Sequence, residues 1–142
     1  QAVLGFALDR FGPRAVTMGG LLAVAAGFVG LAIVPRGVEE GDRWVTLLWA
    51  LVGFGGYGPY VSTMTIGTLF ENPGMFISLN TGAFVISGNV MLGVQYLYEA
   101  NIGVSSADAF FGIAALSVLF AILVFLAFPT IPYKKGDVAE IP

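Results

Sequence analysis

Residues 109–133 read AFFGIAALSVLFAILVFLAFPTIPY, a run of 25 residues without a charged side chain. A helix rises about 1.5 Å per residue, so roughly 20 residues cross a hydrocarbon core of about 30 Å. Because no water is available there to pair with backbone polar groups, a chain that crosses the core satisfies them within a helix. The run therefore predicts a membrane-spanning helix over residues 109–128.

Three further charge-free windows precede it, at residues 15–35, 44–70 and 72–98, and the four windows hold 21 to 27 residues each. Charged residues make up 11% of the chain, against about 25% in soluble domains. Mean hydropathy is +0.88. These features predict an all-α, polytopic transmembrane helical bundle, integral to a lipid bilayer and multi-pass. The expected spans are residues 15–35, 44–70, 75–98 and 109–128.

The segments outside the spans indicate how the spans are connected and oriented. Residues 1–8 are apolar and are interpreted as the end of a truncated helix, residues 9–14 as a loop, and residues 129–142 as a polar tail. Connections this short make neighbouring spans antiparallel. Four basic residues then fall on the side of residues 9–14 and two on the other, so the positive-inside rule places residues 9–14 at the cytoplasm or its equivalent.

Polar residues concentrate in the spans at 44–70 and 75–98, and uncompensated polar groups are costly in lipid. We therefore expect these two spans inside the bundle, with 15–35 and 109–128 as outer supports. The polar side chains could line a cavity and hydrogen-bond a solute. The alternative is hydrogen bonding between helices, at about 0.6 kcal/mol for each pair. The candidates for lining a cavity are Tyr57, Tyr60, Ser62, Thr65, Asn80 and Thr81.

Glycine and proline cluster in the span at 44–70, where bending or local unwinding is expected. Broken helices in transporters often mark the substrate region, and simple kinking is the alternative interpretation. Small residues four apart, such as Ala23 and Gly27, favour close helix packing over a dimer interface. The predicted kink comprises Gly53, Gly55, Gly56, Gly58 and Pro59.

The chain has no cysteine and no histidine, which excludes disulfides, zinc sites of the usual kind and an imidazole proton relay. No Asp, Glu, Lys, Arg or His lies inside a predicted span, which favours a facilitator, or coupling residues in the missing parts, over a proton relay within these spans. No nucleophile–base pair, phosphate loop or metal-ligand spacing is present. We therefore expect no enzymatic activity, no cofactor or metal, and no nucleic-acid partner.

The segment Gly5-Phe6-Ala7-Leu8-Asp9-Arg10-Phe11-Gly12-Pro13-Arg14 places an acid and two arginines between two apolar runs. From physical chemistry alone, a charged loop and a functional hairpin are equally good interpretations. The pattern resembles the loop signature Gly-x-x-x-Asp-Arg-x-Gly-x-Arg of the major facilitator superfamily. Pro13 stands where that family commonly has a basic residue. The resemblance implies a latch between two transporter halves, formed by Gly5, Asp9, Arg10, Gly12 and Arg14.

The same resemblance implies that the chain is a fragment, running from the end of a second helix to a sixth, with a second half missing. Six short stretches are similar to the large-neutral-amino-acid facilitator branch of that family: residues 53–56, 60–62, 69–70, 78–86, 96–100 and 103–105. The implied function is transport of a small polar organic solute by alternating access. A neutral amino acid is the leading candidate for the solute. The alternative is a non-transporting structural subunit, derived from a transporter half, in a larger membrane complex.

Overall fold

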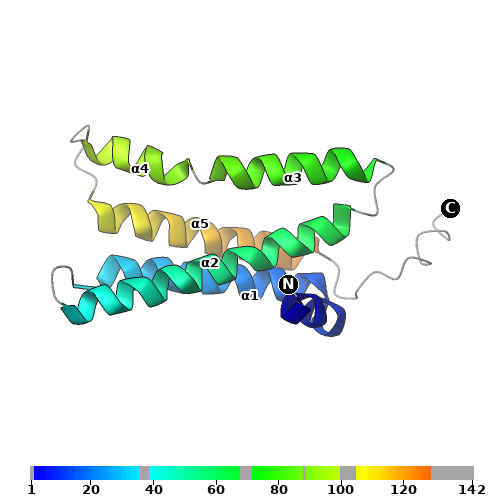
Figure 1. Cartoon of the computed structure of the whole chain (residues 1–142), viewed down its shortest axis with the longest axis horizontal. Coiled ribbons are helices and arrows are strands. Elements are labelled where there is room, and N and C mark those ends of the chain that lie inside the picture. The colour runs from blue at the N-terminus through cyan, green and yellow to red at the C-terminus, as the bar shows by residue number, and fades with distance from the viewer. Residues whose placement is uncertain (1, 36–38, 68–71, 88, 100–104, 129–142) are drawn as a thin grey trace.

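The structure, a computed structural model, describes residues 2–35, 39–67, 72–87, 89–99 and 105–128. Within these residues every regular element is an α-helix, which confirms the predicted all-α class. Figure 1 shows the long helices lying side by side, with two shorter ones end to end along one edge. In chain order the helices are α1 (Ala2–Ile33), α2 (Glu39–Gly67), α3 (Pro73–Ser87), α4 (Val90–Glu99) and α5 (Ser106–Ala127).

Helix α1 changes direction at Gly12, whose φ of 80° and ψ of 164° lie outside the helical region. Residues on both sides of Gly12 are helical, and Figure 1 shows the N-terminal part turned away from the line of the remainder. Pro13 begins the second part, where its missing N–H costs nothing and its fixed φ suits a helix start. The loop expected over residues 9–14 is thus a break at a single residue.

The described core lies between α1, α2 and α5, with α1 in the middle. Phe28 of α1 is 5% exposed, and its ring lies 5.9 Å from the ring of Phe110 on α5 and 6.0 Å from that of Trp49 on α2. Around it, Ala25, Leu31 and Ala114 are buried. The expected arrangement, with 15–35 outside and 75–98 inside, is therefore wrong among the described residues. Glycines on α1 admit α2 on one side, while Phe28 packs against α5 on the other.

Within the part of the chain that the structure describes, two helices are long and apolar enough to cross a membrane, by length and composition: residues Arg10–Ile33 and Ser106–Ala127. Of the four expected spans, these correspond to 15–35 and 109–128. The span expected at 44–70 falls on α2, which begins with charged residues and is rich in glycine and hydroxyl-bearing side chains. The span expected at 75–98 falls on α3 and α4, of 15 and 10 residues.

The break between α3 and α4 follows from the local sequence Ser87-Gly88-Asn89, three residues that favour a helix weakly. The Asn89 N–H donates to the Ile86 carbonyl oxygen at 2.9 Å, which closes a turn. The Asn89 carbonyl oxygen then accepts from the Gly93 N–H at 3.0 Å and starts α4. The polar tail expected at 129–142 lies outside the described residues.

Candidate functional site

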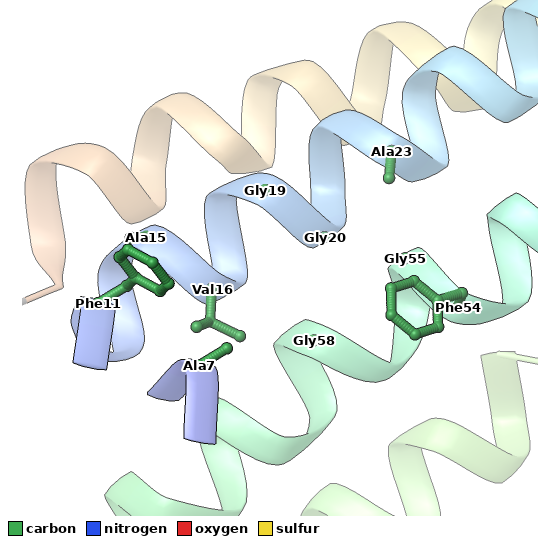
Figure 2. Close-up of a pocket in the computed structure, with 10 residues that line it drawn as sticks. All are labelled: Ala7, Phe11, Ala15, Val16, Gly19, Gly20, Ala23, Phe54, Gly55 and Gly58. Carbon is green, nitrogen blue, oxygen red and sulfur yellow. The ribbon is translucent and has the colours of Figure 1, made fainter. Parts of the chain in front are cut away.

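A pocket of about 260 Å³ lies where the N-terminal part of α1, the rest of α1 and α2 meet. Figure 2 shows its floor formed by the facing backbones of α1 and α2, with Phe11 and Phe54 on its walls. Every residue that lines it is apolar or glycine. The lining residues are Ala7, Phe11, Ala15, Val16, Gly19, Gly20, Ala23, Phe54, Gly55 and Gly58.

Glycines make the contact between α1 and α2 beneath this pocket. A Cβ placed on Gly20 would lie 2.5 Å from the Gly55 carbonyl oxygen and 2.7 Å from Pro59 Cδ. A Cβ on Gly55 would in turn lie 2.7 Å from the Gly20 carbonyl oxygen, and one on Gly58 would lie 3.0 Å from that of Val16. The two backbones are therefore in direct contact, and a side chain at Gly20 or Gly55 would separate them.

The glycine cluster predicted to kink α2 also contributes to helix packing. Helix α2 continues from Glu39 to Gly67 through the whole cluster, with Pro59 inside it. Gly55 and Gly58 face α1, whereas a Cβ on Gly53 or Gly56 would meet nothing within 4 Å. The cluster thus packs against α1 on one side and is open on the other. Helix α2 is not unwound there, and the expected bend stays a prediction.

The two described arginines of the signature segment point to different partners. Arg14 is half-buried, and its guanidinium carbon lies 3.9 Å from the centroid of the Phe125 ring on α5. Arg10 is exposed, and its guanidinium carbon lies 5.9 Å from the centroid of the neighbouring Phe11 ring. Gly5 lies within the N-terminal helical part, and the side chain of Asp9 lies outside the described residues. Arg14 therefore fastens the start of the long part of α1 to the end of α5.

The six residues predicted to line a cavity are spread over α2 and α3, and none lines the pocket at the kink. Tyr57 and Tyr60 lie together, with ring centroids 5.7 Å apart. Thr65 is exposed and donates its hydroxyl to the Val61 carbonyl oxygen at 3.0 Å, and Thr81 is exposed on α3. The structure thus brings the tyrosines together and leaves the two threonines on the surface.

Ser62 and Asn80 are distinguished by buried polar atoms without a partner. Ser62 is 0% exposed, and neither its Oγ nor the Nδ2 of Asn80 makes a hydrogen bond. Native proteins pair more than nine-tenths of buried polar groups, so both atoms call for an explanation.

Helix geometry places Ser62 at the kink. Gly58 lies against Val16, and the antiparallel register puts Ser62, one turn further along α2, at the level of Gly12, one turn back along α1. Gly12 and Pro13 are themselves buried. The break at Gly12 leaves the last carbonyl groups of the N-terminal helical part without their usual intrahelical donors. Ser62 is thus a buried hydroxyl beside a helix end.

Two threonines that sequence reasoning missed support the backbone at the two prolines. Thr17 is 2% exposed and donates its hydroxyl to the Pro13 carbonyl oxygen at 2.7 Å. Thr63 donates to the Pro59 carbonyl oxygen, also at 2.7 Å. The signal was available, because in both cases a threonine follows a proline by four residues and shares its face of the helix.

Comparison with known proteins gives two related sequences. The human protein "Large neutral amino acids transporter small subunit 3" is 30% identical over 100 residues, which cover 70% of this chain and 18% of that protein. The mouse protein of the same name is 29% identical over the same share of each chain. The chain is therefore related to amino-acid transporter proteins, and the matched part spans less than a fifth of their length.

No protein-family description matches the chain, and no solved structure matches it either.

Proposed function

We propose that this chain forms part of a membrane transporter that moves a small polar organic solute, a neutral amino acid, by alternating access. The observation that carries the proposal is the similarity to the human and mouse transporter proteins over 70% of the chain. In such a mechanism one group of helices rocks against another around a site within the membrane. In this proposal α2, and α3 together with α4, cross the membrane as well as α1 and α5. A second transporter half is the partner of this chain.

The proposal includes membership of the major facilitator superfamily, on the strength of the signature segment. The direction of α1 changes at Gly12, a glycine of that signature, which supports a role for the segment as a latch between helices. A latch of this kind holds one orientation of the halves through Asp9, Arg10 and Arg14 and releases them in the other.

A structural subunit without transport activity is the second candidate. The human relative is named a small subunit. In addition, α3 and α4 leave large apolar side chains uncovered, with Val85 67% and Tyr96 72% exposed. A subunit of this type would pack this face against a larger membrane complex.

Uptake of labelled leucine into proteoliposomes, with the protein at its full natural length, tests the proposal. We expect uptake that other neutral amino acids inhibit, and a decrease of about tenfold for Asp9→Ala, because the latch carboxylate is lost. Asp42→Ala, which removes an exposed carboxylate at the start of α2, is the matched control and should leave uptake unchanged. Absence of uptake favours the structural subunit. Uptake that Asp9→Ala leaves unchanged removes the latch from the proposal.

The Ser62→Ala variant should distinguish a role of Ser62 in solute contact from a role in stability. Removing an unpartnered buried hydroxyl removes a desolvation cost of about 1–3 kcal/mol, so the variant should be as stable as the parent or more stable. Uptake should nevertheless fall about five- to tenfold, because a hydrogen bond that forms only during transport contributes about 1 kcal/mol. Both quantities are measured on the same preparation, by unfolding in detergent and by proteoliposome uptake.

Ser117→Ala is the control for this comparison. Ser117 is 6% exposed, and its hydroxyl is already satisfied by the Ile113 carbonyl oxygen at 2.9 Å, so uptake should not change. Equal uptake by Ser62→Ala and the parent protein would exclude Ser62 from the solute path.

A further inference from the structure

We propose that the pocket at the Gly12 kink binds one acyl chain of an anionic phospholipid, with the headgroup phosphate at Arg10. This site is separate from the solute path, since none of the predicted solute-lining residues contributes to it. It requires only that α1 lies in a membrane and does not depend on transport.

The lining of the pocket suits a hydrocarbon chain. Phe11 and Phe54 are each 62% exposed on its walls, and the glycines of α1 and α2 leave room between them. The pocket is open along the surface and contains no polar side chain to satisfy a polar ligand. A flexible acyl chain fills such a groove without leaving unpaired hydrogen-bonding groups.

The rim of the pocket, at Arg10, lies at the depth expected for a lipid headgroup. The apolar stretch that could cross the membrane begins at Arg10, so the pocket lies at one end of that stretch. An acyl chain in the pocket would extend past Gly19 and Ala23 towards the membrane interior, while its headgroup stays at the interface. Figure 2 shows Phe11, Ala15 and Ala23 following one another along α1 in this direction.

The positive charge of Arg10 favours an anionic headgroup. The guanidinium carbon of Arg10 lies 5.9 Å from the centroid of the Phe11 ring, which is part of the pocket wall. Arg14 is turned towards Phe125, so Arg10 supplies the positive charge at the rim. Guanidinium groups bind phosphate with paired donors, and one basic residue near an anionic lipid surface contributes about a fivefold gain in affinity. The net negative headgroup of phosphatidylglycerol is therefore favoured over the zwitterionic headgroup of phosphatidylcholine.

Native mass spectrometry of the protein at its full natural length, released from detergent with equal amounts of the two lipids, tests this site. The lipids carry identical acyl chains, so only the headgroup differs. We expect phosphatidylglycerol to be retained about fivefold better than phosphatidylcholine. Arg10→Gln should abolish this preference, whereas Arg43→Gln, at an exposed arginine of α2, should preserve it.

A second pair of variants tests the acyl groove. A Cβ on Gly19 meets nothing within 4 Å, so Gly19→Leu should fill the pocket without separating α1 from α2. Gly53→Leu is the matched control, because Gly53 is equally open and lies outside the pocket. We expect Gly19→Leu to reduce lipid retention at least fivefold and Gly53→Leu to leave it unchanged.

Three outcomes would overturn the proposal. Equal retention of the two lipids by the parent protein would identify ordinary surrounding lipid. Retention unaffected by Gly19→Leu would place the lipid elsewhere. If Gly19→Leu destabilised the protein in lipid-free detergent and Gly53→Leu did not, the groove would be filled by another helix.

Discussion

Gly20→Ala is expected to destabilise the protein by about 1–3 kcal/mol, the usual cost of overpacking a close contact. The new Cβ would lie 2.5 Å from the Gly55 carbonyl oxygen and 2.7 Å from Pro59 Cδ. One obstacle is backbone and the other a proline ring, so neither can turn away as a flexible side chain would. The α1–α2 contact can accept the methyl group only if the two helices move apart.

The neighbouring residue provides an unusually close control. A Cβ on Gly19 meets nothing within 4 Å, and both glycines lie in the same helix. Alanine favours a helix over glycine by up to about 1 kcal/mol, so Gly19→Ala should be neutral or slightly stabilising. The midpoint of unfolding in increasing SDS, compared for both variants, measures the difference. Equal midpoints would show that α1 and α2 are not in backbone contact in the membrane.

The position of α5 could be predicted from the charge map, but the residue at which it begins could not. Residues 109–128 were expected to span, and α5 runs from Ser106 to Ala127. The expected span began after the charge at Asp108, whereas Asp108 belongs to the helix. The Ser105 N–H donates to Asp108 Oδ2 at 3.0 Å, and the Asp108 N–H donates to Ser105 Oγ at 3.1 Å. A carboxylate in such a capping box stabilises the first turn, so a charge can lie inside the helix it appears to limit.

Helix neighbours could be predicted less well, because they depend on residues far apart in the chain. The polar content of residues 44–70 and 75–98 suggested that both spans lie inside. In the structure, α1 takes that place, because Gly20 and Gly27 admit α2 on one side while Phe28 packs against α5 on the other. Small residues were recognised in the sequence, yet their spacing does not say which helix they meet.

The candidate site shows the same limit. Residues 9–14 were expected to form a loop, and the φ of 80° at Gly12 shows that the change of direction there needs a glycine. The pocket beside it could not be predicted, since Ala7 and Gly58 lie 51 positions apart and meet only through the kink. Ser62 was selected for its polarity, and its burial at the level of Gly12 emerges only from the register of α1 against α2.

Gly12→Ala is expected to reduce uptake at least tenfold. A φ of 80° with a ψ of 164° is a conformation that side chains with a Cβ rarely adopt, at a cost of about 1–3 kcal/mol. The variant can relieve the strain by continuing the helix through residue 12, which straightens α1 and pulls the signature segment away from α2. Asparagine should not rescue it, because the left-handed helical conformation that asparagine tolerates has a ψ near 50°.

The geometry of α1 can be measured directly, because the chain contains no cysteine and accepts spin labels at chosen sites. Labels at Phe6 and Val29, both exposed, would be about 35 Å apart in a straight helix and closer in the kinked one. The distance should be short in the parent protein and lengthen towards about 35 Å in Gly12→Ala. Gly53→Ala, at an open helical glycine, should change neither distance nor uptake. If Gly12→Ala kept the short distance and full uptake, the kink would not depend on glycine and the latch would lose its hinge.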